Sequence, residues 1–211
     1  MTVIAVRDVS KSFKQIPLLE KVNFDINEGG SYALVGPNGS GKSVLLKLMC
    51  HFLAPDRGRV DIDPAYLSSR RTFPASFGIT INGPAYLPHR TAEENLLELA
   101  RIRGVVGIRE VRTILDQLDL RPQHRLRARN LSQGMKQKLA LAQALMEEPS
   151  VLILDEPFNA LDTESAEQVR AILKREKARG TTIVFTSHVV GDVEDLADEV
   201  LEISGRTVTV R

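Results

Sequence analysis

The sequence has 211 residues, of which 43% are hydrophobic and 26% charged, a composition that fits one large α/β domain or at most two small ones. Its 28 Lys and Arg nearly balance its 27 Asp and Glu, which argues against a nucleic-acid binder that relies on bulk charge. The single cysteine, Cys50, permits no intramolecular disulfide and makes a cysteine-based zinc site improbable. We see no secretory signal and no apolar run of the roughly 18 residues that span a bilayer. We therefore expect a chain that does not cross a membrane by itself.

The first third of the chain predicts short strands and turns. A glycine-rich turn follows residue 35, and the apolar stretch 44–53 after it predicts a buried helix that ends before Pro55. β-branched, alternating or apolar residues predict strands at 2–6, 22–26, 31–35 and 58–62.

The middle third is helical. After a strand candidate at 77–81, Thr91 and Glu94 have the spacing of a capping box, which marks a helix start. The periodicity of 108–120 predicts a second helix, and Ser132 opens a third that runs to Glu148.

The last third alternates strands and helices again. The expected strands are 151–154, 181–187, 199–203 and 206–210, and the expected helices are 163–180 and 191–197. This alternation implies a parallel sheet covered by helices, and the helical middle third reads as an insertion into that core.

Residues 36–43 fit the pattern G-x-x-x-x-G-K-[ST] between an apolar strand and an apolar helix. In such a loop, backbone amides and the helix N-terminus point at phosphate, the side chain of Lys42 reaches the β- and γ-phosphates, and the Ser43 hydroxyl can ligate Mg²⁺. The alternative is an ordinary glycine-rich turn, which the strand and helix context disfavours. The expected nucleotide-binding residues of this segment are Gly36, Pro37, Asn38, Gly39, Ser40, Gly41, Lys42, Ser43 and Val44.

Two acids, Asp155 and Glu156, end the buried strand 151–154. Ligands of parallel sheets bind at the carboxyl ends of strands, so Asp155 is placed to hold Mg²⁺ and Glu156 to polarise an attacking water. Taken alone, both could be ordinary loop acids; the phosphate loop favours the catalytic interpretation.

With these residues the chain resembles the ATP-binding subunit of ABC transporters over its whole length. Residues 131–135 look like the signature motif of that family, and 159–162 look like its D-loop. His188 looks like the switch histidine, Phe13 falls where the family stacks an aromatic ring on adenine, and Asn82 falls where it usually has a glutamine.

The resemblance implies a P-loop NTPase (RecA-like) core with a parallel sheet, an N-terminal antiparallel β region and an inserted helical subdomain at about 84–134, all in one domain of residues 1–211. ATP and Mg²⁺ are the implied cofactors. The implied catalytic residues are Lys42, Glu156 and His188, and the implied metal ligands are Ser43, Asn82 and Asp155.

The resemblance also implies a head-to-tail homodimer, in which each ATP lies between the phosphate loop of one copy and Ser132 and Gly134 of the other. Ser132 could instead be only a helix cap, or serve both purposes. Phe13 could instead be a buried core aromatic, and His188 a structural histidine.

Three positions depart from the family pattern. Gln133 and Met135 replace the usual Gly and Gln of the signature, a variation that resembles bacterial peptide-antibiotic self-resistance exporters. Asn82 is one methylene shorter than glutamine, so we expect weakened coupling rather than lost catalysis.

Just before the signature, Arg121, Arg125, Arg127 and Arg129 form a basic run. We interpret this run as a solvated loop in preference to a contact with acidic lipid or an acidic partner.

The function that follows is an ATPase that drives a separate membrane permease, an exporter by its subfamily, peripheral on the cytoplasmic face of the cell membrane and without a specific nucleic-acid partner. The alternatives are a soluble ATPase of the same class, in DNA repair, iron–sulfur assembly or translation, and a nucleotide-sensing pseudo-ATPase. The intact Lys42, Glu156 and His188 disfavour the last. The segment 83–88 is expected to line the permease-binding cleft, with Tyr86 either an interface anchor or packed within its own subunit.

Overall fold

The strands form two sheets in the computed structural model of the chain, which describes residues 1–68, 73–121 and 125–211. The antiparallel sheet has the order β2-β1-β4, and the larger sheet has the order β5-β6-β7-β3-β8-β9, parallel except for β9. The antiparallel strands are β1 (Thr2–Phe13), β2 (Ile16–Asn27) and β4 (Arg57–Ile62). The strands of the larger sheet are β3 (Ser31–Val35), β5 (Phe77–Thr80), β6 (Val151–Leu154), β7 (Thr182–Thr186), β8 (Glu199–Ser204) and β9 (Thr207–Val210).

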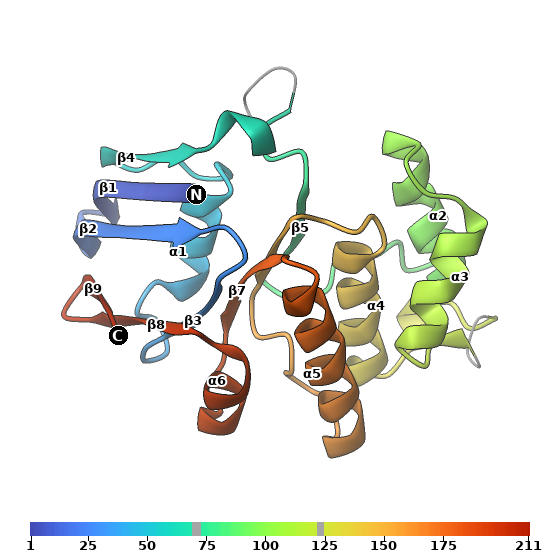
Figure 1. Cartoon of the computed structure of the whole chain (residues 1–211). Coiled ribbons are helices and arrows are strands. Elements are labelled where there is room, and N and C mark those ends of the chain that lie inside the picture. Colours follow the sequence, from blue (N-terminus) through green and yellow to red (C-terminus); the bar gives the residue numbers. More distant parts are fainter. Residues whose placement is uncertain (69–72, 122–124) are drawn as a thin grey trace.

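The helices flank this larger sheet. Figure 1 shows the antiparallel sheet at one end of the molecule and the pair α2 and α3 at the other, with α4 and α5 between. The α-helices are α1 (Lys42–Met49), α2 (Ala92–Arg103), α3 (Ile108–Gln117), α4 (Gln133–Leu145), α5 (Thr163–Ala178) and α6 (Val190–Leu196), and 3-10 turns cover Pro64–Tyr66 and Ala128–Asn130.

The larger sheet separates two apolar clusters, which explains why its strands are apolar throughout. In β6, Leu152 and Leu154 face the cluster formed with α2 to α5, whereas Val151 and Ile153 face the cluster formed with α1 and the antiparallel sheet. All four residues of β6 are buried because side chains alternate between two covered faces. The predicted α/β core with an N-terminal antiparallel region is therefore confirmed.

Two predicted helix starts are confirmed in atomic detail. The Glu94 amide donates to the Thr91 hydroxyl at 3.2 Å, and the Thr91 amide donates to the Glu94 carboxylate at 2.8 Å, which completes the capping box of α2. The Met135 amide donates to the Ser132 hydroxyl at 3.1 Å, so Ser132 caps α4. These local sequence signals fix where the helices begin.

The first helix is shorter than the predicted 44–53. It ends at Met49 because His51 adopts a left-handed conformation, with φ 58°. The amides of His51 and Phe52 then donate back to the carbonyls of Leu48 and Lys47, at 3.1 and 2.9 Å, a Schellman-type ending. Because the apolar run continues past Met49, a prediction from hydrophobicity alone puts the C-terminal end of this helix too late in the sequence.

The first hairpin is longer than the predicted strands 2–6 and 22–26. Strands β1 and β2 pair antiparallel along nearly their full length, from Thr2 opposite Asn27 to Phe13 opposite Ile16. The turn residues Lys14 and Gln15 both have positive φ, 49° and 65°, without the Asn-Gly signal that usually marks such turns. Because much of this sheet is open to solvent, its polar residues obscure the strand pattern.

The basic run before the signature is exposed where the structure describes it. Arg125, Arg127 and Arg129 are all solvent-exposed, and Arg121 pairs with Asp116 at 2.7 Å. Residues 122–124 lie outside the described part of the chain. Exposure is compatible with a solvated loop and with a contact to acidic lipid or an acidic partner, so the interpretation as a solvated loop stays a prediction.

The described ranges contain no helix that is both long and apolar enough to cross a membrane.

Cys50 is expected to be unreactive in the folded protein. Its side chain is fully buried, and desolvation raises the pKa of its thiol to about 12, so the thiolate that reacts with disulfide reagents is nearly absent at neutral pH. Ellman's reagent should therefore modify Cys50 only after denaturant unfolds the chain. Stoichiometric labelling of the native protein within minutes would contradict this burial.

Candidate active site

The phosphate-type loop connects β3 to α1 as the sequence predicted. Gly41 immediately precedes α1 with φ 105°, a conformation that L-residues with a side chain rarely adopt. The ammonium group of Lys42 is almost buried and donates to the carbonyls of Gly36 and Pro37, at 2.8 and 3.2 Å. The loop thus holds a cation against its own carbonyls, and an anionic phosphate would be attracted to it.

Thr186 connects the two acids that follow β6. Its hydroxyl donates to the Asp155 carboxylate at 2.9 Å and accepts from the Glu156 amide at 2.7 Å. Thr186 ends β7, which pairs parallel with β6, so the carboxyl ends of both strands meet at one edge of the sheet. The strand pairing therefore fixes the two acids against the neighbouring strand.

Glu156 and His188 are brought together. The Nε2 atom of His188 lies 2.7 Å from the Oε1 atom of Glu156, and both side chains are partly open to solvent. The turn that carries His188 is held by Ser187, whose hydroxyl donates to the buried Asp192 at 3.0 Å. Asp192 also accepts from Arg170 of α5 at 2.7 Å, so the position of His188 is set by packed, paired groups.

A cleft of about 420 Å³ joins the phosphate loop to the acids. Next to this cleft, the backbone amide of Asn82 donates a hydrogen bond to the Oδ2 atom of Asp155 at 3.3 Å. The side chain of Asn82 is exposed. The residues that line the cleft are Ser43, Gly83, Pro84, Gln133, Gln137, Asp155, Glu156, Asn159 and Ala160.

Three non-glycine residues at this edge have left-handed backbones. The φ values are 64° for Asn82, 50° for Glu156 and 61° for Ala160. Such conformations are uncommon for L-residues and persist where the surrounding contacts hold them, which is frequent at functional sites. The turns around the cleft are thus held by tertiary contacts.

Ser132 and Gly134 lie apart from the phosphate loop, in a different pocket of about 890 Å³ between α4, the end of α3 and the start of α5. Gly134 packs so closely on the turn before α5 that an added Cβ would be 2.8 Å from the Ala160 carbonyl oxygen. At the same turn, a hydrogen bond from the Ser165 amide lowers the pKa of the Asp162 carboxyl below its usual range. Ser132 and Gly134 therefore do not line the cleft that contains Ser43, although Gln133 of the same motif does.

Phe13 is 46% exposed, so the alternative of a buried core aromatic is wrong. It ends β1, and the ammonium group of Lys11 lies 5.7 Å from its ring centroid. The ring is free to stack on a ligand, and its role toward adenine stays a prediction.

Two residues of the site were missed by sequence analysis. Thr186 is a polar residue at the end of an otherwise apolar strand, a position that could have marked it. Gln137 lies among the buried residues of α4, and its side-chain amide donates to the carbonyls of Glu156 and Pro157. A glutamine on a buried helix face is the corresponding signal, because a buried amide requires partners.

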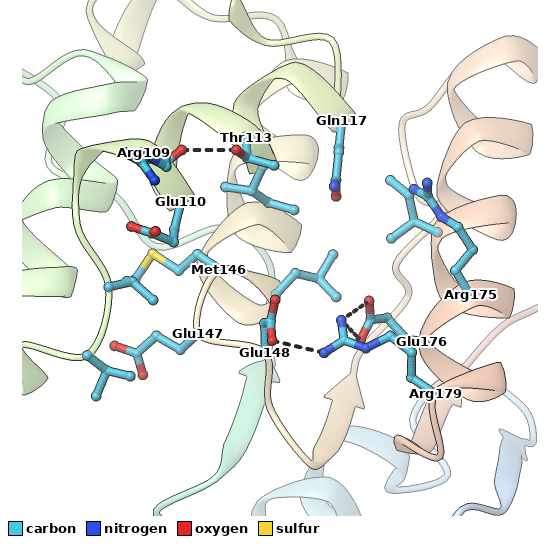
Figure 2. Close-up of a pocket in the computed structure, with 15 residues that line it drawn as sticks. Arg109, Glu110, Thr113, Gln117, Met146, Glu147, Glu148, Arg175, Glu176 and Arg179 are labelled. Carbon is cyan, nitrogen blue, oxygen red and sulfur yellow. Dashed lines mark hydrogen bonds and ion pairs between the residues drawn. The ribbon is translucent and has the colours of Figure 1, made fainter.

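Figure 2 shows another cleft, of about 560 Å³, between α3, the end of α4 and the C-terminal half of α5. Apolar and charged side chains line it together, and Arg179 reaches both Glu148 and Glu176, at 3.0 and 3.2 Å. Among the described residues, none that the sequence predicts to bind nucleotide lines this cleft. The predicted nucleotide-binding residues of the phosphate loop and the two acids therefore lie elsewhere, at the edge of the larger sheet.

The oxygen donors at that edge fit Mg²⁺. Within residues 1–68, 73–121 and 125–211, no group of three or more His, Cys, Asp or Glu side chains could hold a metal alone. Mg²⁺ in nucleotide sites instead takes one or two protein oxygens and completes its shell with phosphates and water. The Ser43 hydroxyl and the Asp155 carboxylate, which line the same cleft, are donors of that kind.

Comparison with known proteins agrees with this geometry. The family described as ABC transporter matches residues 19–159. An uncharacterized ABC transporter ATP-binding protein, YybJ of Bacillus subtilis, is 35% identical over 98% of this chain and 95% of its own length. The bacitracin transport ATP-binding protein BcrA of Enterococcus faecalis is 35% identical over 93% of this chain, which spans 64% of that relative.

Solved structures show the same fold. The ATP-binding subunit of an ABC transporter superposes with a TM-score of 0.88 and 27% identity, covering 100% of this chain and 90% of the other. A dimeric ATP-binding cassette in a post-hydrolysis state, bound to ADP and Pi, superposes with a TM-score of 0.85 and 25% identity, covering 99% of this chain and 97% of the other. The phosphate loop, the acids after β6 and this likeness together lead to one conclusion. The chain belongs to the ABC transporter family, as an ATP-binding and ATP-hydrolysing subunit.

Proposed function

We propose that ATP is hydrolysed at the edge of the larger sheet, with Glu156 as the general base and His188 beside the γ-phosphate. The observation that carries this proposal is the 2.7 Å contact between these two side chains, of which Glu156 lines the cleft that also contains Ser43 and Asp155. Glu156 accepts a proton from the attacking water. Lys42 and the amides of the loop stabilise negative charge on the phosphates.

In this proposal Ser43 and Asp155 would hold Mg²⁺, and Asn82, whose backbone amide donates to the Asp155 carboxylate at 3.3 Å, is the third candidate ligand. The ion supplies charge neutralisation on the β- and γ-phosphates when it is bound. Thr186 keeps the Asp155 carboxylate in place through its hydroxyl. Phe13 offers its exposed ring to adenine.

The complete site requires a second copy of the chain. Ser132 and Gly134 lie at the start of α4, where amides favour an anion, but they open into a different pocket from Ser43. A head-to-tail homodimer would place each ATP between the loop of one copy and the signature of the other. The dimeric form of the cassette bound to ADP and Pi supports the formation of a dimer.

The cellular function that fits best is to drive a separate membrane permease from the cytoplasmic face, in an exporter. The likeness to the bacitracin transport protein supports a role in transport, and the proposal of export rests on the signature residues Gln133 and Met135. We infer that residues 1–211 form one domain, in which the helices between β5 and β6, at about 84–134, act as a helical subdomain that receives the permease. No observation specifically favours the alternative of a soluble ATPase that acts outside transport.

The segment 83–88 is the candidate docking site. The side chain of Leu87 is 50% exposed, and its backbone is fixed by Asn95, which accepts from the Leu87 amide at 2.6 Å and donates to its carbonyl at 3.1 Å. Tyr86 is only partly exposed: it packs against the apolar cluster of the helices, and the ammonium group of Lys136 lies 5.6 Å from its ring centroid. A held backbone and an exposed Leu87 present an ordered apolar surface.

The permease proposal can be tested by copurification. A tagged chain, isolated from detergent-solubilised membranes of its host, should carry a polytopic membrane protein with it. Recovery of the chain only from the soluble fraction would contradict the proposal.

Leu87→Ala should reduce the amount of permease recovered. Tyr86→Ala should cost about 2 kcal/mol of binding and should also lower the melting temperature, because its ring packs on the core. Val210→Ala, which alters an aliphatic side chain of similar exposure on β9, is the matched control.

A further inference from the structure

Gln137 lies on α4, five residues after the helix cap Ser132, and its side chain is 6% exposed. Its Nε2 atom donates to two successive backbone carbonyls, 3.0 Å to that of Glu156 and 3.2 Å to that of Pro157. A buried side-chain amide whose two hydrogen bonds both go to one short turn is placed to hold the conformation of that turn.

The turn in question is the one that aims Glu156. The backbone of Glu156 has φ 50°, which an L-residue adopts at a cost in free energy unless contacts hold it. The Glu156 amide donates to the Thr186 hydroxyl at 2.7 Å on one side, and Gln137 holds its carbonyl on the other. The residue is thus clamped at both ends of its backbone, from β7 and from α4.

We propose that Gln137 is a positioning residue for the catalytic carboxylate, acting through the backbone of Glu156 and Pro157; this inference rests on the proposed role of Glu156 as the base. Loss of the amide would remove this donor from the Pro157 carbonyl and leave the Glu156 carbonyl with the Asn159 amide, at 3.1 Å, so the left-handed turn would be held less firmly. A small displacement of a catalytic group lowers the rate steeply, because the base must meet the proton it abstracts.

The same contact has a second consequence. Ser132 caps helix α4 and Gly134 lies in its first turn, and the same helix carries Gln137. The proposed dimer presents Ser132 and Gly134 to the ATP of the other copy. A shift of α4 when its N-terminus meets that ATP would therefore be transmitted to the base of its own copy. Gln137 ties the two sites of the dimer through one rigid helix.

The test compares Gln137→Met with Gln143→Met in the full-length chain. Methionine nearly matches glutamine in length and shape but donates no hydrogen bond. Gln143 is the matched control: it lies on the same helix, and its amide donates to a different backbone carbonyl, that of Ala85, at 2.9 Å. The measurements are the melting temperature and the kcat and KM for MgATP.

We expect Gln137→Met to lower kcat about 10- to 100-fold, with KM for MgATP within about twofold of the unmodified chain. Gln143→Met should keep kcat and should lower the melting temperature less than Gln137→Met does, because Gln143 makes one exposed hydrogen bond and Gln137 makes two that are at least partly buried. Gln137→Asn, which keeps an amide one methylene shorter, should recover part of the loss and serves if the Met variant does not fold. Equal kcat values for the two Met variants, or a loss that follows the unfolded fraction alone, would overturn the proposal.

A parallel Glu156→Gln variant separates this inference from the function beneath it. If Glu156→Gln is inactive and Gln137→Met behaves as its control does, only the positioning role fails. If Glu156→Gln retains turnover, the base assignment fails, and the positioning role fails with it.

Discussion

Glu156→Gln is expected to bind ATP with nearly unchanged affinity and to hydrolyse it at least about 100-fold more slowly. The amide has the shape of the carboxylate, so the turn between Thr186 and Gln137 should keep its geometry. It cannot accept the proton of an attacking water, so the chemical step slows while the binding contacts remain. Steady-state phosphate release and equilibrium nucleotide binding measure the two effects separately.

The same variant should accumulate as a nucleotide-bound dimer, because ATP that is not hydrolysed keeps both copies engaged. Size-exclusion chromatography with ATP and Mg²⁺ would detect it. Glu167→Gln, which changes an exposed acid on α5, provides the control for the loss of one negative charge. Turnover of the Glu156 variant within a few-fold of that of the control would remove Glu156 from the role of base.

The parts of the site that the sequence predicted are those encoded by a contiguous motif. The phosphate loop takes its glycines, its lysine and its serine from eight successive residues, and a strand and a helix on either side fix its context. The acids after β6 were predicted because a short, wholly apolar run that ends in two acids marks a buried strand that ends at a site.

The parts that the sequence did not predict depend on pairing between distant segments. Thr186 can hydrogen-bond to Asp155 and Glu156 only because β7 lies next to β6. The sequence of a single strand does not reveal which strands lie beside it in the sheet. Gln137 reaches the same turn from α4, whose buried face is set by tertiary packing. Periodicity predicts that α4 has a buried face, but it does not predict which backbone carbonyls accept hydrogen bonds from the side chains on that face.

The misplaced boundaries have a similar origin. Helix α1 stops where His51 turns left-handed although the sequence remains apolar, since the ending is a backbone motif with a non-glycine residue at its key position. Strands β1 and β2 extend well beyond their apolar residues because backbone pairing continues through polar, half-exposed positions. In both regions, backbone hydrogen bonds determine the boundary and hydrophobicity does not.

Lys42→Ala is expected to weaken ATP binding about 10- to 100-fold, the equivalent of one charge-assisted contact of roughly 1.5–3 kcal/mol. The ammonium group now donates to the carbonyls of Gly36 and Pro37 inside the loop, so it lies where phosphate oxygens would meet it. Removing it also frees those two carbonyls, which makes loss of loop order part of the effect.

Lys47→Ala changes a lysine in the last turn of the same helix, away from the loop, and controls for charge and helix stability. Equilibrium dialysis with a non-hydrolysable ATP analogue would give both affinities, and circular dichroism would show that both variants fold. The Lys42 variant should lose affinity through its phosphate contact, so adenosine, which lacks phosphates, should bind both variants equally weakly. An unchanged affinity for the ATP analogue in a folded Lys42→Ala chain would mean that residues 36–43 are a turn and not a phosphate site.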